Sequence, residues 1–176
     1  MPNSEIDVAE RHSEAAAAFS FQGVVDARQR AHALLLVLLA GGGGLGGLGL
    51  AQWSTQPILG AAGLGSSVFW FVLAAWLATK ALTSESIRAW NTVGLLEKHE
   101  EWTKYADEVA QEGGAAVDVL AELRRSAIRN TELAANEYRA ASTLVFAVVD
   151  KTLRWMSLTP VVCVISAVAV GLLRKA

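Results

Sequence analysis

Apolar and charged positions alternate in blocks along this chain, and one block contains no charge at all. Residues 33–79 include no Asp, Glu, Lys or Arg and are mostly apolar. A helix needs roughly 20 apolar residues to cross a bilayer core of about 30 Å. The block therefore predicts a membrane hairpin with spans at about 33–51 and 57–79. A short polar turn, residues 52–56, joins them.

A third apolar stretch runs from about Trp155 to Leu173 and is interrupted by polar residues and Pro160. Its length is near the lower limit for a span. Two interpretations are open: a third transmembrane helix, or a segment that lies in the membrane interface. We prefer the crossing helix, which gives residues 155–176 a short span followed by a basic tail.

The region between the hairpin and this third stretch, residues 80–154, predicts long helices. Residues 81–154 contain no proline and are rich in Ala, Glu, Leu and Arg, which favour helix. Gly113-Gly114 interrupts them and predicts a turn. After the turn, a spacing of three and four residues is typical of a coiled-coil seam: Val117, Leu120, Arg124, Ala127, Thr131, Ala134, Tyr138, Ala141, Val145, Val148, Thr152 and Trp155.

Charge predicts how the two arms of this region pair. The charged side chains from Glu97 to Glu112 are predominantly acidic, whereas Arg124, Arg125 and Arg129 follow the turn. Exposed ion pairs contribute at most about 1 kcal/mol each, but they can select one pairing over another. We therefore expect an antiparallel helical hairpin. The alternative is one continuous rod with a weak point at the glycines.

The first 32 residues are alanine-rich and mildly amphipathic. We expect their later half to form a helix that lies on the membrane or leads into the first span. For residues 1–12, a frayed tail is an equally good interpretation.

Basic residues orient the predicted spans, because cytoplasmic loops carry an excess of Lys and Arg. The positions that flank the spans on one side are Arg28, Arg30, Lys80 and Arg154. The 52–56 turn has no positive charge. The N-terminus and residues 80–154 are thus expected in the cytoplasm, with the chain in a bacterial inner membrane. Trp53 and Trp155 suit the outer and inner interfaces. Arg174 and Lys175 would then lie outside, against the rule.

Small residues are concentrated in the hairpin and predict close helix packing. In lipid, small residues four apart let helix backbones approach each other. The positions that we expect to pack are Ala40, Gly42, Gly43, Gly44, Gly46 and Gly47 in the first span, with Gly60 and Gly63 in the second. Two interpretations remain open: association between copies of the chain, or packing of two spans of one chain. Under the first, Gly42→Leu or Gly46→Leu would weaken oligomers.

The same glycines have the spacing of a dinucleotide-binding motif, but the residues that follow them do not fit such a site. Residues 44–49 read G-x-G-x-x-G, but no acidic residue occurs between Asp26 and Glu85. A dinucleotide site needs a helix directly afterwards and an acidic residue about 20 positions on. We therefore expect no nucleotide cofactor.

Composition limits the remaining chemistry. Of 176 residues, 53% are hydrophobic and 18% are charged, which is more apolar than a typical soluble domain. A net charge of −2 gives no reason to expect nucleic acid as a partner. The single Cys163 excludes an intramolecular disulfide framework. No nucleophile-elbow or Glu-x-x-His pattern occurs. We predict no catalytic residue, metal or cofactor, and no enzymatic activity.

Two resemblances accompany this interpretation. The order of a charged N-terminal helix, a membrane hairpin and cytoplasmic helices, over roughly residues 15–112, resembles the small two-span effector modules of bacterial defence loci. Those modules are thought to disrupt membranes when triggered. The Leu-Gly alternation from Gly44 to Leu50 is similar to the glycine–leucine repeats of magnetosome membrane proteins. Neither resemblance assigns a role to a residue.

The sequence therefore predicts an all-α integral membrane protein with a glycine-rich two-span hairpin, a cytoplasmic helical hairpin and a short third span. We expect a membrane-anchored scaffold or assembly subunit. Its partners would be the lipid bilayer, further copies of the chain and a cytoplasmic protein. The alternative function is an oligomeric pore-forming effector that permeabilises membranes.

Overall fold

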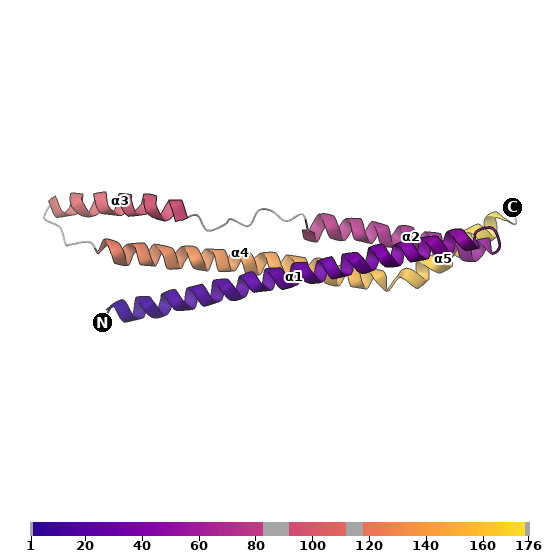
Figure 1. Ribbon diagram of the computed structural model, residues 1–176, viewed down its shortest axis with the longest axis horizontal. Coiled ribbons are helices and arrows are strands. Elements are labelled where there is room, and N and C mark those ends of the chain that lie inside the picture. The colour runs from indigo at the N-terminus through magenta and orange to yellow at the C-terminus, as the bar shows by residue number, and fades with distance from the viewer. Residues whose placement is uncertain (1, 83–91, 112–117, 175–176) are drawn as a thin grey trace. The chain divides into compact units, whose positions relative to one another are not determined.

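The computed structural model describes residues 2–82, 92–111 and 118–174, and all regular structure in these ranges is helical (Figure 1). The elements are α1 (Pro2–Gln52), α2 (Pro57–Leu77), the π-helix η1 (Ala78–Leu82), α3 (Thr92–Gln111), α4 (Val119–Met156) and α5 (Thr159–Leu173). This confirms the all-α class. The predicted turn at Gly113-Gly114 lies outside the described residues.

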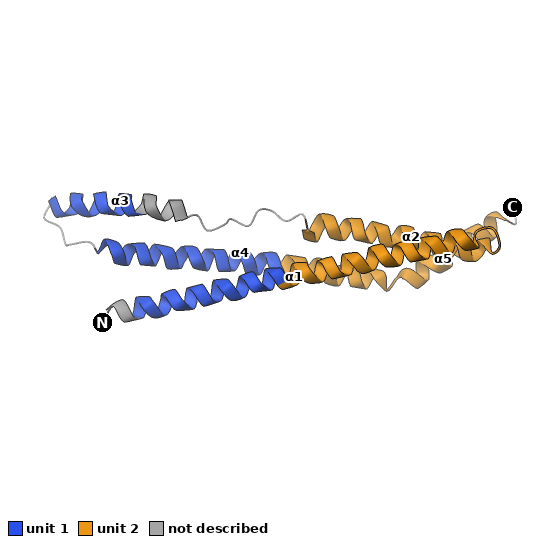
Figure 2. Cartoon of the chain, in the orientation of Figure 1, with its two compact units in different colours: residues 1–25, 85–142 blue, residues 26–84, 143–176 orange. Residues whose placement is uncertain are grey.

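The chain divides into two compact units (Figure 2). Unit 1 comprises residues 1–25 and 85–142, and unit 2 comprises residues 26–84 and 143–176. Helices α1 and α4 each contribute residues to both units. Unit 2 also contains α2, η1 and α5, whereas unit 1 contains α3.

Two helices are long and apolar enough to cross a membrane, and a bent pair of helices would make a third span. The first two contain the predicted spans: α1 ends at Gln52, and α2 begins at Pro57 and continues into η1. A proline suits the first turn of a helix, because the N–H that it lacks would have no partner there. In the connecting turn, the Gln56 N–H donates to the Gln52 carbonyl at 2.7 Å.

The third apolar stretch differs from the expected helix that starts at Trp155. Helix α4 continues through Trp155 to Met156, and α5 begins only at Thr159, after a bend of 42°. Pro160 explains the break, because its missing N–H and its ring are incompatible with a helix interior. α5 is therefore a short helix joined to the end of α4.

Helix α1 runs unbroken from Pro2 to Gln52, so residues 1–32 do not form a separate element. Its buried side chains recur every seven residues, at Ser13, Ser20, Ala27 and Leu34, as in a coiled-coil seam. In unit 1, the Phe21 ring meets the Tyr138 ring of α4 edge-on, with centroids 5.5 Å apart. The later half of residues 1–32 thus leads directly into the first predicted span, which is one of the two interpretations given above, and it packs against α4. Residues 2–12 continue the same helix, where a frayed tail was an equally good interpretation.

Helix α4 buries a stripe that overlaps the predicted seam only in part. Thr131, Val145 and Thr152 belong to the predicted seam and are buried. Between them, however, Ala135 and Val149 are the buried residues, each one position later than the predicted Ala134 and Val148. Near the ends of the predicted seam, Leu120 and Trp155 are exposed, while its first member, Val117, lies outside the described residues.

The apolar core of unit 2 is built from α1, α2, η1 and α4. It consists of Ala27, Ala31, Leu34, Leu38, Leu73, Ala74, Leu77, Ala81, Val145 and Val149. Leu38 and Leu77 are fully buried. Burial of such side chains contributes about 1.5–3 kcal/mol each in water, whereas between helices in lipid close packing replaces this term.

Candidate functional site

Glycines on one face of α1 leave room for side chains of α2. A β-carbon built on Gly46 would lie 2.8 Å from the Ser67 Oγ, and one built on Gly42 would lie 3.4 Å from the Trp70 Cβ. A β-carbon on Gly41 would overlap the Trp70 ring. These three glycines therefore create the space that side chains of α2 occupy.

Near the turn of the hairpin, glycines on both helices bring the backbones together. A β-carbon on Gly60 would lie 2.9 Å from the Gly49 carbonyl oxygen, and one on Gly63 would lie 2.9 Å from the Gly49 Cα. A real Cβ does not approach backbone atoms so closely. Gly60 and Gly63 thus pack against α1 of the same chain, as small residues do at helix interfaces in membranes.

The opposite face of α1 has no partner within the described residues. Nothing lies within 4 Å of a β-carbon built on Gly43, Gly44 or Gly47. Ala40 is exposed, one turn before Gly44. The expected packing set therefore separates into two faces. Gly42, Gly46, Gly60 and Gly63 pack within the hairpin, whereas Ala40, Gly43, Gly44 and Gly47, which we call the open glycine face, do not.

Polar side chains connect α2 to α5, a contact that the sequence interpretation did not foresee. The Trp70 Nε1–H donates to the Thr159 Oγ1 at 2.9 Å. The Ser66 Oγ and Cys163 Sγ lie 2.8 Å apart, and a β-carbon on Gly65 would overlap the Ser166 side chain. The signal was present in the sequence, because these partners recur at helical spacing in each apolar stretch.

The predicted interface anchors lie at exposed or partly exposed positions. Trp53 in the hairpin turn is 47% exposed and Trp155 is 46% exposed. In unit 2, the Arg30 guanidinium lies 5.4 Å from the Phe146 ring centroid, which joins α1 to α4. Within α4, Arg154 forms an ion pair with Asp150 at 2.7 Å. Lys80 is exposed in η1, while Arg28 is partly buried.

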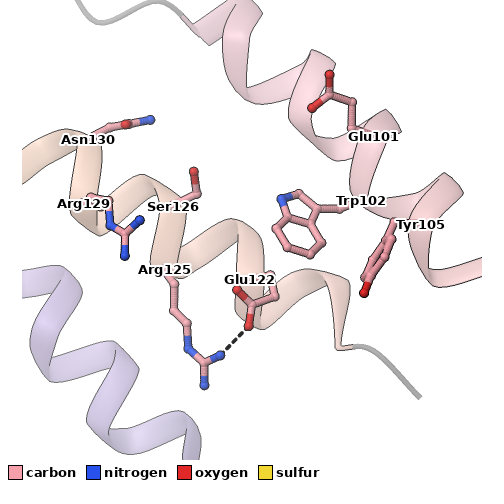
Figure 3. A pocket seen from close by; sticks show the side chains of 8 residues that line it. All are labelled: Glu101, Trp102, Tyr105, Glu122, Arg125, Ser126, Arg129 and Asn130. Atoms are coloured by element: carbon pink, nitrogen blue, oxygen red, sulfur yellow. Dashed lines mark hydrogen bonds and ion pairs between the residues drawn. The ribbon is translucent and has the colours of Figure 1, made fainter. Parts of the chain in front are cut away.

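A second candidate site is a groove in unit 1 with a volume of about 620 Å³ (Figure 3). Helix α3 contributes Glu101, Trp102 and Tyr105. Helix α4 contributes Glu122, Arg125, Ser126, Arg129 and Asn130. The Trp102 indole projects from α3 toward α4, and the Trp102 and Tyr105 rings meet edge-on with centroids 5.8 Å apart.

The ion pairs of Arg124 and Arg125 in α4 differ from the pairs with α3 that the charge pattern predicted. Arg124 pairs with Asp7 of α1 at 2.9 Å, and Arg125 pairs with Glu122 of its own helix. Neither pair involves the acidic residues of α3. The expectation missed Asp7 because it considered only the charges on either side of Gly113-Gly114.

Among the described residues, no three His, Cys, Asp or Glu side chains gather closely enough to hold a metal ion. Searches of family models, curated proteins and solved structures found no match to this chain. Function is therefore inferred from the chain's own residues.

Proposed function

We propose that this chain is a membrane-anchored scaffold or assembly subunit of a bacterial inner membrane. In this proposal α1 and α2 cross the membrane as a hairpin and α5 crosses as a short third span. The N-terminus and unit 1 then face the cytoplasm. The charge-free block at residues 33–79 and the basic residues at its two ends support this placement.

The open glycine face is the observation that carries the assembly part of the proposal. Each glycine in a helix costs up to about 1 kcal/mol relative to alanine. At Gly42 and Gly46 the packing of α2 offsets this cost. At Gly43, Gly44 and Gly47 nothing within the described part of the chain does so. A helix from a second copy, packed closely on this face, would supply the missing contact.

Unit 1 provides the surface that we assign to a cytoplasmic protein partner. Its groove combines an indole and a phenol with side chains of both charges. Aromatic residues and arginines are enriched at protein interfaces. Clustered membrane subunits that display such grooves would hold several partner molecules together.

A pair of double variants tests the assembly proposal. Gly43→Leu/Gly47→Leu should leave the hairpin intact and reduce the oligomer mass in lipid nanodiscs, because both positions are open. The matched control, Gly42→Leu/Gly46→Leu, should instead lower thermal stability, because these positions face Trp70 and Ser67. An oligomer mass that is unchanged in the first variant would contradict the proposal.

The pore-forming effector remains the alternative function, and a dye that reports membrane potential separates the two. As a scaffold, the chain should leave the potential of expressing cells unchanged. Rapid depolarisation before growth stops, abolished by Gly43→Leu/Gly47→Leu, would instead establish the effector.

A further inference from the structure

Lys151 of α4 and Trp76 of α2 meet in unit 2, and a further lysine and tryptophan lie near them in sequence on the same two segments. The Lys151 Nζ lies 5.6 Å from the centroid of the Trp76 ring. Lys80 follows Trp76 by four residues, and Trp155 follows Lys151 by four residues, so each pair lies about one turn apart on its helix. We call these four residues the lysine–tryptophan cluster.

The directions of the two helices determine how the side chains of Lys80 and Lys151 are inclined. The contacts Trp70–Thr159 and Trp76–Lys151 show that α2 runs antiparallel to the segment formed by α4 and α5. Side chains on a helix tilt toward its N-terminus. By this rule Lys80 tilts toward Trp76, and Lys151 tilts toward the start of α4, so the two side chains are inclined in opposite directions along the antiparallel pair.

The cluster carries a local positive charge in a chain whose net charge is −2. Lys80 and Lys151 are both exposed. Asp150, the neighbour of Lys151, already pairs with Arg154 at 2.7 Å. Within the described ranges, neither lysine takes part in an ion pair. Both ammonium groups are thus available to an anion.

The position of the cluster suits the boundary between lipid tails and headgroups. Trp76 belongs to the charge-free block, and Lys80 is the first charge after it. Indole rings prefer the membrane interface, and a cation over an indole face gains electrostatic attraction. Basic pockets between membrane helices on the cytoplasmic side bind the headgroups of anionic lipids.

We propose that the lysine–tryptophan cluster binds the phosphate headgroup of an anionic phospholipid in the inner leaflet. This inference rests on the proposed membrane insertion. Lys80 and Lys151 donate hydrogen bonds to the phosphate oxygens, while Trp76 and Trp155 contact the glycerol region. The bound lipid would fill the junction of α2 and α4 and fix the depth of unit 2 in the bilayer.

Native mass spectrometry of the full chain, released from nanodiscs with equal amounts of phosphatidylglycerol and phosphatidylcholine, tests the site. The unaltered chain should retain phosphatidylglycerol in preference. Lys151→Gln and Lys80→Gln should each reduce that preference by about fivefold, the effect expected for one lysine at an anionic surface. Lys104→Gln in α3 removes the same charge far along the sequence and should leave the preference unchanged.

Four results would overturn the lipid site. The preference could be absent from the unaltered chain, survive both cluster variants, or fall equally with Lys104→Gln. Displacement of the lipid by excess inorganic phosphate would assign the cluster to a soluble anion and also overturn it. In each case the chain would still be recovered in nanodiscs, whereas failure to enter any bilayer would contradict the proposed function itself.

Discussion

Trp70 connects three helices through one side chain. Its ring lies over Gly41 of α1, and its Nε1–H donates to Thr159 at the start of α5. The Thr159 hydroxyl in turn donates to the Met156 carbonyl at 2.6 Å. That carbonyl lies at the end of α4, where the helix loses its regular hydrogen bonds. The Trp70–Thr159 contact therefore stabilises α5 against α2 and also stabilises the bend before α5.

A double-mutant cycle at this contact should measure its contribution. We expect Trp70→Phe and Thr159→Val to show a coupling free energy of about 0.6 kcal/mol, the average for hydrogen bonds between membrane helices. Reversible unfolding in mixed micelles gives the free energies. Trp76→Phe paired with Thr159→Val serves as the control and should show no coupling. Equal coupling in both cycles would mean that the hydrogen bond is not its source.

At the scale of helices, hydropathy predicted the elements that contain long apolar runs without charge. The spans at 33–51 and 57–79 lie within α1 and within α2 and η1, because charge is absent there. The seam of α1 in unit 1 escaped prediction because two of its buried members, Ser13 and Ser20, are small and polar, which leaves Val24 as an isolated apolar member. Each hydroxyl donates to a carbonyl of its own helix, at 2.8 and 2.7 Å, and so needs no other partner.

For the candidate site, the sequence predicted that small residues pack, but not which of them face α2 and which remain open. The glycine pattern identified the packing residues but could not assign Gly46 to α2 and Gly47 to the open glycine face. Both residues satisfy the same spacing rule. Which glycine is covered depends on the side of α1 against which α2 packs. In the structure, Trp70 and Ser67 of α2 lie against Gly42 and Gly46. Likewise, hydropathy cannot choose between Ala134 and Ala135 in α4.

Two alanines of α4 that differ in burial test the packing of unit 1. Ala135 is 3% exposed, whereas Ala140, five residues later on the same helix, is exposed. Ala135→Leu should destabilise the protein by about 1–3 kcal/mol, the usual cost of overpacking, and Ala140→Leu should change stability by less than about 0.5 kcal/mol. Chemical denaturation followed by circular dichroism measures both. A similar loss in the two variants would place the buried stripe of α4 elsewhere.

An exposed ion pair in the same unit should matter much less. Asp7 and Arg124 bond at 2.9 Å, but their side chains are 51% and 37% exposed. Asp7→Asn should therefore lower the free energy of unfolding by less than about 1 kcal/mol. The same denaturation experiment serves as the measurement. A loss as large as that of Ala135→Leu would show that charge, and not small-residue packing, holds α1 on α4.

At the scale of the whole molecule, the proposal combines two functions in one chain. In it, unit 2 would be the membrane anchor; within this unit α1 packs on α2 through one glycine face, and α2 is joined to α5 by polar contacts. Unit 1 provides the groove that we assign to a partner. The open glycine face would provide contacts between copies, so the anchor would also determine how many grooves are brought together.

Cysteine cross-linking on two adjacent residues of α1 tests this account most directly. In a Cys163→Ser background, Gly47→Cys should form disulfide-linked dimers in membranes, because a disulfide needs Cα atoms within about 7 Å. Gly46→Cys, which faces Ser67 of the same chain, should remain largely monomeric. Equal cross-linking at both positions, or none at position 47, would contradict assembly through the open glycine face.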